Sequence, residues 1–582
     1  MSAADSSSEN ERGLLDEAAT ARATRLIDEG NAMEDQGRLG EALEHYENAI
    51  GIAPKLVRAH LNRGNVLMQM GQMALAHKSY ETALIIDPGY AAAHFNMGNA
   101  YLRSNQPTAA LRCYDKAMAI DAAFVECELA RANVLDDLGQ FDAALDGCRR
   151  VLERRPDFFE AHSNLLFSHN YRGSYRAEWM LADARRFGAV AARHARIARS
   201  WGNSRDPDRC LRVGLVSGDL RSHPVGYFVE GILDALARNA SGRLALHAYS
   251  TTTDSDAVST RIRSHCRAWT SIAGVPDSVA AGKVVEDGID ILLDLSGHTA
   301  GNRLGLFAWK PAPVQATWLG YWATTGLAEM DYLIADPVTL PPSEEKYFTE
   351  RIWRLPETRL CFTAPNESID PGPLAALANG YVTFGCCNNL SKMNDDVVLV
   401  WGRILRAMPT SRLLLKAKQL NEESVRQDVE QRFSRQGIGA DRLMLEGPSS
   451  RADYLTAYRR IDIALDPFPF PGGTTSAEAL WMGVPVQTLN GEHFLSRQGA
   501  GILTNAGLPD WIADNTADYV TRTVAHASDT DALAALRNVL RQQVMASPLF
   551  DAQRFANHFE AALRAMWRQW CGQDSAAWNA PR

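Results

Sequence analysis

Residues 461–489, IDIALDPFPFPGGTTSAEALWMGVPVQTL, place a helical segment between two short apolar segments. IDIALDPF (461–468) and VPVQTL (484–489) have the length and apolar character of buried strands, whereas AEALWMG between them has the composition of a helix. Strands that alternate with helices are typical of parallel α/β layers, in which ligands bind at the carboxyl ends of the strands. The glycines and hydroxyl residues that follow the first strand therefore mark a candidate ligand-binding loop.

The same alternation runs through the chain from about residue 205 and divides into two lobes. A segment rich in proline and acidic residues, 337–380, separates them and is predicted to be a linker. Because both sheets are expected to be open and parallel, two facing lobes would place a cleft between them. The predicted strands are 211–220, 244–250, 289–297 and 314–321 in the first lobe, and 381–387, 411–417, 442–447, 461–468 and 484–489 in the second.

The first third of the chain repeats itself with a step of 34 residues. A small residue followed by asparagine begins at positions 30, 64, 98 and 132, and alanines recur at 42, 76, 110 and 144. Tyrosines follow the same step at 46, 80 and 114, and prolines at 54 and 88. This pattern resembles the tetratricopeptide repeat, a helix pair that buries its apolar face only by stacking on its neighbours. We predict repeats at 23–56, 57–90, 91–124 and 125–158, followed by a capping helix in AHSNLLFSHNY (161–171).

The composition is that of an ordinary globular protein and argues against several classes of function. The 582 residues hold 60 Lys and Arg against 69 Asp and Glu, so the basic surplus of a nucleic-acid-binding protein is missing. The N-terminal MSAADSSSENERGLL has no signal-peptide pattern, and no apolar run is long enough to span a membrane. The nine cysteines form no C-x-x-C pair, which predicts reduced thiols in a cytoplasmic protein.

Four long segments resemble the catalytic region of the O-linked N-acetylglucosamine transferases and of the SPINDLY-type protein O-fucosyltransferases. They are VGLVSGDLRSHPVGYF (213–228), LDLSGHTAGNRLGLFAWKPAPVQATWLGYWATTG (293–326), TFGCCNNLSK (383–392) and LDPFPFPGGTTSAEALWMGVPVQTLNG (465–491). The resemblance, which includes the repeats, implies an α-helical tetratricopeptide solenoid followed by an α/β GT-B region of two Rossmann-like lobes.

The same resemblance implies the activity. It predicts an inverting protein O-glycosyltransferase, without cofactor or metal, that transfers N-acetylglucosamine from UDP-GlcNAc to Ser or Thr of acceptor proteins. Transfer of fucose from GDP-fucose is the close alternative. A catalytically inactive repeat scaffold is the alternative from another class.

This organisation assigns a role to each part of the chain. The C-terminal helix is expected to cross back onto the first lobe, and its alternative role is a contact in a homodimer. The predicted parts are a flexible N-terminus (1–22), repeats with a capping helix (23–170), connecting helices (171–205), the first lobe (206–336), the linker (337–380), the nucleotide-sugar-binding lobe (381–545) and the C-terminal helix (546–582).

The phosphate contacts of the donor are predicted in the second lobe. Backbone amides and hydroxyls at Gly472, Gly473, Thr474 and Thr475 open a helix, so they are suited to hold the β-phosphate. The resemblance adds Lys392, which would stabilise the departing nucleotide, and Asn389, which would contact phosphate. The structural alternatives are an ordinary capped turn for the loop, a solvent-facing lysine and a turn asparagine.

The resemblance also assigns the nucleoside. Glu478, placed in the first turn of the helix, would hold the ribose hydroxyls, and its alternative role is that of an N-terminal helix acid. Ser449 and Tyr454 correspond to the base-contacting loop and helix. Tyr454 replaces a histidine of the animal enzymes, so the identity of the base stays open.

His223 is the candidate catalytic base. It follows the first strand of the first lobe, histidine titrates near neutral pH, and the family has a histidine beside the sugar and the acceptor. An aspartate debated for the animal enzymes falls near Gly282 here, which removes that proton route. Asp294 and His298 are further candidates for catalysis or sugar binding, because a buried acid is costly unless hydrogen-bonded or functional. The alternative for all three is loop and cap hydrogen bonding.

Acceptor proteins are assigned to the repeats by the same resemblance. The asparagine that follows each small residue would line a concave groove and hydrogen-bond an extended peptide, or else it satisfies helix ends. These residues are Asn31, Asn65, Asn99 and Asn133. Two Asp-x-Asp pairs, at 254–256 and 529–531, stand outside the matched segments and are interpreted as chance occurrences rather than metal sites.

Overall fold

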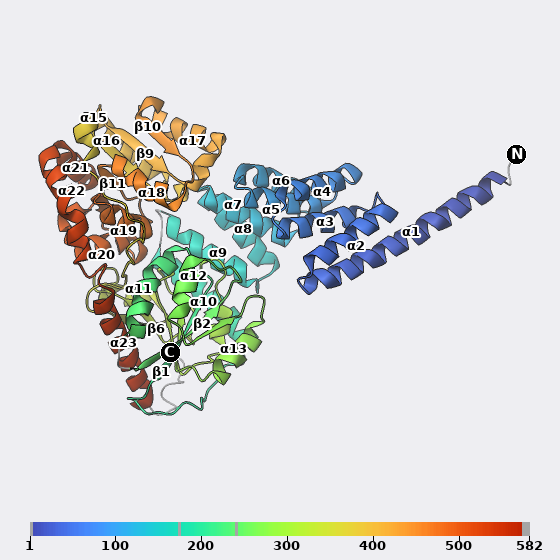
Figure 1. Cartoon of the computed structure of the whole chain (residues 1–582), viewed down its shortest axis with the longest axis horizontal. Coiled ribbons are helices and arrows are strands. Elements are labelled where there is room, and N and C mark those ends of the chain that lie inside the picture. Colours follow the sequence, from blue (N-terminus) through green and yellow to red (C-terminus); the bar gives the residue numbers. More distant parts are fainter. Residues whose placement is uncertain (1–3, 173–175, 239–241, 573–582) are drawn as a thin grey trace. The chain divides into compact units, whose positions relative to one another are not determined.

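The computed structural model describes residues 4–172, 176–238 and 242–572, with side chains in the first helix from Glu17 onward (Figure 1). The chain forms two compact units, Met1–Arg154 and Arg155–Arg582. Within the described ranges, no helix combines the length and the apolar character needed to cross a membrane.

The first unit is a stack of helix pairs that follows the 34-residue step of the sequence. Within a pair, the glycine of one helix faces the tyrosine of the next: a Cβ on Gly64 would lie 2.4 Å from Cε1 of Tyr80, and one on Gly98 would lie 2.5 Å from Cε1 of Tyr114. Only a residue without a side chain permits this crossing, which explains why glycine and tyrosine recur together. The helices are α1 (Ala4–Asp35), α2 (Leu39–Ile52), α3 (Val57–Gln69), α4 (Met73–Ile86), α5 (Ala91–Arg103), α6 (Pro107–Ile120), α7 (Val125–Asp137) and α8 (Phe141–Arg154).

The N-terminal segment is helical, whereas the sequence predicts a flexible segment. Residues 4–22, expected to be flexible, form the first part of α1, whereas residues 1–3 lie outside the described residues. Ala23 and Ile27 of the same helix are buried with Tyr46 of α2. Packing therefore nucleates the helix at residues 23–35, and its extension toward the N-terminus costs little once a turn exists.

The second unit begins with the predicted capping helix. Its Phe159 packs edge-on against Phe187, with ring centres 5.6 Å apart. Residues 171–205 were expected to hold several connecting helices; one helix is present, the described residues 195–205 are neither helix nor strand, and 173–175 are not described. Residues 195–205 contain the turn-forming stretch Gly-Asn-Ser at 202–204 and lie just before Pro207, which accounts for the difference. The elements are α9 (Phe159–Ser168), η1 (His169–Tyr171) and α10 (Ala177–His194).

The first lobe is a parallel sheet in the order β3-β2-β1-β4-β5-β6-β7. All four predicted strands are present, and three four-residue strands that the sequence analysis missed complete the sheet. One of them, β7, lies inside the segment 337–380, so this segment is not a linker throughout. The elements are β1 (Leu211–Ser217), α11 (Pro224–Arg238), β2 (Leu244–Ser250), α12 (Ala257–Ser264), β3 (Ala268–Ser271), α13 (Asp277–Glu286), β4 (Ile291–Asp294), α14 (Leu304–Ala308), β5 (Val314–Thr317), β6 (Tyr332–Ala335), η2 (Pro342–Tyr347) and β7 (Arg351–Arg354).

The second lobe is also parallel, in the order β10-β9-β8-β11-β12-β13. Its five predicted strands are present, and the two-residue β13 adds an edge. The elements are α15 (Ala375–Asn379), β8 (Thr383–Cys386), η3 (Leu390–Lys392), α16 (Asp395–Ala407), β9 (Arg412–Lys416), η4 (Lys418–Asn421), α17 (Glu423–Ser434), η5 (Ala440–Arg442), β10 (Leu443–Glu446), α18 (Arg451–Ala457), η6 (Tyr458–Arg460), β11 (Ile463–Leu465), α19 (Thr474–Trp481), β12 (Val486–Leu489), η7 (Leu495–Arg497), α20 (Gln498–Asn505), η8 (Pro509–Trp511), β13 (Ile512–Ala513), α21 (Thr516–Ser528) and α22 (Thr530–Met545).

The last helix, α23 (Ala552–Gly572), returns to the first lobe and packs along α11 (Figure 1). The ring of Phe559 lies 4.5 Å from that of Trp318, and Nε1 of Trp567 donates to the carbonyl of Asp206 at 3.0 Å. The apolar face of α23 is thus buried within its own chain, so the alternative of a homodimer contact through that face is wrong. A homodimer through another surface stays a prediction, and residues 573–582 of the predicted helix lie outside the described residues.

Candidate functional site

The predicted phosphate-binding loop joins β11 to α19, with Gly473 as the N-cap residue of the helix. The backbone N–H of Gly472 donates to Oδ1 of Asp466 at 2.7 Å. A Cβ on Gly472 would lie 2.4 Å from Oγ1 of Thr475 and 2.3 Å from Oγ of Ser476, so a side chain at this position would displace the hydroxyls of the loop. The first amides of a helix have no intrahelical acceptor, and they favour an anion at this position.

Lys392 lies beside this loop, at the end of η3. Its Nζ donates to Oδ1 of Asn388 and to the carbonyl of Pro471, both at 3.1 Å, and lies 4.1 Å from the centre of the Phe470 ring. Burial lowers the pKa of Lys392 to about 8, although the charge of Asp466 opposes the shift. The ammonium is held by neutral carbonyls and a ring rather than by a carboxylate, so an incoming anion would not have to displace an ion-pair partner.

Two residues that sequence reasoning missed organise the loop and the lysine. Oδ1 of Asn388 accepts from Lys392 and also from Oγ1 of Thr475, at 3.0 Å, so it joins the two predicted phosphate ligands. Asp466 accepts from Gly472 and, at 2.9 Å, from Oγ1 of Thr488, and burial raises its pKa to about 6. The pattern I-D-I-x-L-D, which occurs at 289–294 and again at 461–466, is the signal that could have found Asp466.

Asn389 and Ser449, the two other residues predicted to contact phosphate and base, bond to residues of their own lobe. Oδ1 of Asn389 accepts from the backbone N–H of Ser391 at 3.0 Å and from Gln419, which are the contacts of a turn asparagine. Ser449 is exposed, and its hydroxyl lies 3.4 Å from the carbonyl of Ser450. Their assignments to phosphate and base stay predictions.

Glu478, Tyr454 and Arg451 form one cluster on the second lobe. Glu478 lies in the second turn of α19 rather than the first. Its carboxylate pairs with Arg451 and accepts from the Tyr454 hydroxyl at 2.9 Å, and burial raises its pKa. The Arg451 guanidinium also lies 4.9 Å from the ring centre of Tyr227 in α11, so this cluster touches the first lobe. The structure thus brings Glu478, predicted for the ribose, together with Tyr454, one of the two residues predicted for the base.

His223 immediately precedes α11 and lies beside an acid that the sequence analysis did not single out. Nδ1 of His223 is 3.6 Å from Oδ1 of Asp219 and accepts from the backbone N–H of Val225 at 3.4 Å. Partial burial lowers the pKa of His223 and raises that of Asp219. A histidine that stays neutral near pH 7 has a lone pair to accept a proton, as a general base requires.

Asp294 and His298 hold parts of the first lobe together. Asp294 accepts from the backbone N–H groups of Ser296 and Gly297 and, at 2.8 Å, from the Thr317 hydroxyl, and burial raises its pKa to about 6. Nε2 of His298 lies 3.0 Å from the Thr325 carbonyl, and burial lowers its pKa to about 3. These contacts favour the alternative of loop positioning, and a catalytic or sugar-binding role stays a prediction.

The residues considered as metal or proton-transfer alternatives have structural environments. Asp256 caps α12 by accepting from Ser259 N–H at 2.9 Å, and Asp529 caps α22 by accepting from Ala532 N–H at 3.0 Å. Gly282 lies within α13, where a Cβ would meet nothing within 4 Å. Over the ranges that the structure describes, no three His, Cys, Asp or Glu side chains gather in a way that could hold a metal ion.

The asparagines of the repeats bond to their neighbours in the stack. Oδ1 of Asn65 accepts from the Tyr80 hydroxyl at 2.9 Å and from Nδ2 of Asn96 in the next pair at 2.8 Å, and Asn99 accepts from Tyr114 at 2.6 Å. Asn31 lies at the corresponding position beside Tyr46 and Asn62, but the swapped orientation of its amide satisfies its partners better, with the oxygen accepting from Arg58. Asn133 is exposed. The stack thus fixes the amide oxygens of Asn65 and Asn99, which orients their nitrogens.

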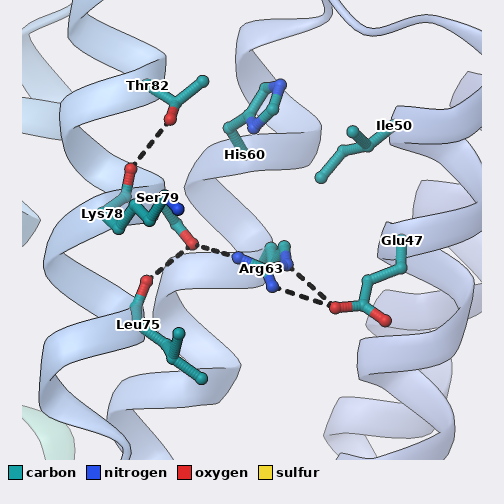
Figure 2. Close-up of a pocket in the computed structure, with 8 residues that line it drawn as sticks. All are labelled: Glu47, Ile50, His60, Arg63, Leu75, Lys78, Ser79 and Thr82. Atoms are coloured by element: carbon teal, nitrogen blue, oxygen red, sulfur yellow. Dashed lines mark hydrogen bonds and ion pairs between the residues drawn. The ribbon is translucent and has the colours of Figure 1, made fainter.

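A separate pocket of about 340 Å³ lies among α2, α3 and α4 of the first unit (Figure 2). Arg63 stands at its centre, where it pairs with Glu47 at 3.0 Å and donates to Ser79 at 2.8 Å. The central cation is therefore already paired within the repeat stack. None of the predicted acceptor-binding asparagines lines this pocket; it is lined by Glu47, Ile50, His60, Arg63, Leu75, Lys78, Ser79 and Thr82.

Comparison with known families identifies the class of protein. Residues 185–363 and 374–559 match glycosyl transferase family 41, and residues 30–71, 64–105 and 91–123 match the tetratricopeptide repeat. The catalytic match covers more than half of the chain, so the chain belongs to glycosyl transferase family 41. Its helical repeats and two parallel sheets are the tetratricopeptide and GT-B parts of that family.

Individual relatives agree with this membership. The protein of Petunia hybrida named "Probable UDP-N-acetylglucosamine--peptide N-acetylglucosaminyltransferase SPINDLY" is 38% identical over 424 residues, which are 72% of this chain and 45% of that protein. The SEC protein of Arabidopsis thaliana, with the same enzyme name, is 27% identical over 62% of this chain and 37% of its own length. This chain therefore spans about half or less of these curated relatives.

A solved structure matches over nearly the whole chain. It is a mutant of the O-GlcNAc transferase of Thermobaculum terrenum, with 32% sequence identity and a TM-score of 0.74. The match covers 95% of this chain and 98% of that one.

Proposed function

We propose that this protein is an inverting protein O-glycosyltransferase that transfers N-acetylglucosamine from UDP-GlcNAc to Ser or Thr of acceptor proteins. The observation that carries the proposal is the convergence of Lys392 and Thr475 on Asn388, beside the glycine turn at the start of α19. A cation, a hydroxyl and helix N-terminal amides together suit a diphosphate leaving group. The names of the petunia and Thermobaculum relatives support N-acetylglucosamine as the transferred sugar.

In the proposed reaction, the acceptor hydroxyl oxygen attacks the anomeric carbon as the bond from that carbon to the β-phosphate oxygen breaks. Lys392 and the amides of the loop take up the charge that develops on the departing diphosphate. The proton of the hydroxyl passes to a base, for which His223 is the candidate. Attack opposite the leaving group inverts the anomeric carbon.

The donor is tested with a panel of nucleotide-sugars. We expect UDP-GlcNAc to give the fastest release of free nucleotide and a mass increase of one N-acetylhexosamine on an acceptor protein. GDP-fucose is the second candidate, because Tyr454, the residue proposed to contact the base, stands where the animal enzymes have a histidine. Its hydroxyl donates to Glu478. A deoxyhexose mass increase with GDP-fucose alone would replace the first donor by the second. No turnover of any donor would support the inactive scaffold.

Chelators are expected to leave the reaction unchanged, because the proposal assigns all stabilisation of the leaving group to Lys392, hydroxyls and amides. Turnover is measured with excess EDTA and again after addition of Mn²⁺ or Mg²⁺. Loss of turnover with EDTA that Mn²⁺ restores would contradict this prediction and would return attention to the Asp-x-Asp pairs.

Acceptor binding is proposed for the repeat stack. Because the oxygens of Asn65 and Asn99 accept from tyrosines within the stack, their nitrogens are oriented to donate to carbonyls of an extended peptide. Asn31 and Asn133 would extend the same row.

A further inference from the structure

Gln498, the first residue of α20, joins three segments that are far apart in the sequence. Its Oε1 accepts from Nε1 of Trp322 at 2.7 Å and from Nη2 of Arg359 at 2.9 Å. Trp322 is in the first lobe, and Arg359 follows β7 and is bonded to that lobe, because its backbone N–H donates to Asp336 and its carbonyl accepts from Trp318. Its Nε2 donates to the carbonyl of Gly472 in the proposed phosphate loop, at 3.3 Å. A single side-chain amide therefore connects the first lobe to the loop of the second.

The two first-lobe donors fix the orientation of this amide. A glutamine amide has one acceptor end and one donor end, and two N–H groups converge on the acceptor end. The donor end must then face Gly472, and it also lies against Gly473, where a Cβ would stand 3.0 Å from Nε2. In the opposite orientation, which the donors of Trp322 and Arg359 disfavour, the amide oxygen of Gln498 would face the Gly472 carbonyl oxygen, and the two oxygens would repel each other.

This node is buried, so its hydrogen bonds are not interchangeable with water. Gln498 is 3% exposed and Arg359 is 1% exposed. Nε and Nη1 of Arg359 have no hydrogen-bond partner among the described residues, although its guanidinium lies 4.8 Å from the Phe494 ring centre. Within the described ranges, Oε1 of Gln498 is thus the one side-chain atom that accepts a hydrogen bond from the Arg359 guanidinium. Loss of that acceptor leaves a buried cation with no side-chain hydrogen bond, which is costly.

The aromatic neighbours of Trp322 lie on the same side of the loop. The Trp322 ring packs on Phe470, with ring centres 5.0 Å apart, and Phe470 in turn lies under the Lys392 ammonium. The ring of Tyr171, which ends the capping segment after the repeats, also packs against Phe470, with ring centres 4.7 Å apart. The first lobe and the capping segment thus contact the residues that border the proposed donor site.

We propose that Gln498 is a positioning residue through which Trp322 and Arg359 of the first lobe hold the Gly472–Gly473 turn in its anion-binding form. Asp466 holds the turn from within the second lobe, through the Gly472 N–H, while Gln498 holds the Gly472 carbonyl from the side of the first lobe. Diphosphate binding by the second lobe consequently depends on a residue of the first. The inference rests on the proposed nucleotide-sugar function for the identity of the ligand but not for the coupling between lobes.

The coupling is tested with UDP and GDP as probes, titrated into the full-length protein by calorimetry. Gln498→Leu is expected to raise the Kd of the binding nucleotide about 10-fold, the effect of losing buried hydrogen bonds. Trp322→Phe removes the N–H donor together with the five-membered ring of the indole, leaves a six-membered ring to face Phe470, and is expected to raise the Kd several-fold. Both substitutions break the same hydrogen bond between Trp322 and Gln498. The Kd of the double variant should therefore lie within about 2-fold of the Kd of Gln498→Leu alone. Unchanged affinity in Trp322→Phe, or effects that multiply, would overturn the proposal.

A measurement without nucleotide separates this inference from the proposed function. Trp322→Phe is expected to speed hydrogen exchange of amides at 467–476 while leaving those of β9, 412–416, unchanged. If neither nucleotide binds the wild-type protein, the proposed function fails and the exchange result decides the inference. Equal exchange at 467–476 in both proteins would overturn it even if nucleotide binds.

Gln487 provides the matched control. It is a fully buried glutamine of β12 whose side-chain Nε2 donates to the Trp511 carbonyl at 3.2 Å. Its backbone carbonyl accepts from the Asp466 N–H, a contact that a side-chain substitution keeps. Gln487→Leu is expected to lower Tm as much as Gln498→Leu does, but to leave the nucleotide Kd and exchange at 467–476 unchanged. If Gln487→Leu weakens binding to the same extent, the effect of Gln498 is general destabilisation and the proposal is wrong.

Discussion

Lys392→Ala is expected to lower the rate of sugar transfer by at least about 100-fold, the scale on which one preorganised charge-stabilising group acts. The Nζ of Lys392 is held at 3.1 Å by both Asn388 and Pro471, so the ammonium is positioned before a donor arrives. Its loss should affect kcat more than donor affinity, because the charge it meets develops as the diphosphate leaves. The measurement is steady-state transfer with the donor that the panel identifies, together with Tm.

The pH dependence follows from the buried environment of Lys392. Burial lowers the pKa of Lys392 to about 8, and the ammonium is the active form. We therefore expect kcat/KM, which reports the free enzyme, to have its full value below that pKa and to fall as pH rises through it. Lys392→Arg stays charged across this range and should lose the alkaline fall, even if its maximum is lower.

Lys310 is the control for burial alone. It is also a buried lysine, but its Nζ pairs with Asp331 and donates to the Glu329 carbonyl, away from the loop of the second lobe. Lys310→Ala should lower Tm, because it leaves Asp331 without its buried partner, while the folded protein keeps its rate and pH profile. Near-normal transfer by Lys392→Ala would remove Lys392 from the mechanism.

Removal of residues 1–154, the first compact unit, should lower transfer to protein acceptors by more than about 10-fold while donor hydrolysis stays within about 3-fold. The repeats contact mainly one another, and α9 with α10 covers the start of the second unit through Phe159 and Phe187. The comparison requires folded, monodisperse material, because exposed apolar surface promotes aggregation. Equal modification of protein acceptors by both forms would show that the repeats do not present the substrate.

Point variants in the full chain separate the asparagines from the stability of the stack. Asn65→Ala with Asn99→Ala removes the proposed peptide donors but also breaks the bonds from Tyr80 and Tyr114. Tyr80→Phe with Tyr114→Phe breaks the same bonds and leaves the asparagines. Protein transfer should fall in the first pair and persist in the second, and equal losses would assign the asparagines to structure alone.

The sequence by itself determined the parts of the fold that repeat or alternate. A 34-residue step specifies the helix pairs, because a glycine meets a tyrosine at the crossings of the first three pairs. The apolar segments specify nine strands, because segments of this length and apolar character are buried in sheets. It also indicated the glycine loop and Lys392, because both follow strand ends in segments that resemble the family.

The tertiary structure decided which polar residues meet. CCNNLSK offers two adjacent asparagines, and only packing shows that Asn388 reaches Lys392 and Thr475 while Asn389 caps a turn. The short strand β7 falls among prolines and acids, where local sequence predicts a linker and pairing with β6 determines the strand. Gln498 has no motif of its own, because its role depends on donors 139 and 176 residues away in the chain. Local propensity and periodicity determine most of the helices and strands, whereas pairing determines a short strand such as β7, and the direction of a buried amide or acid is determined by the partners that the fold brings to it.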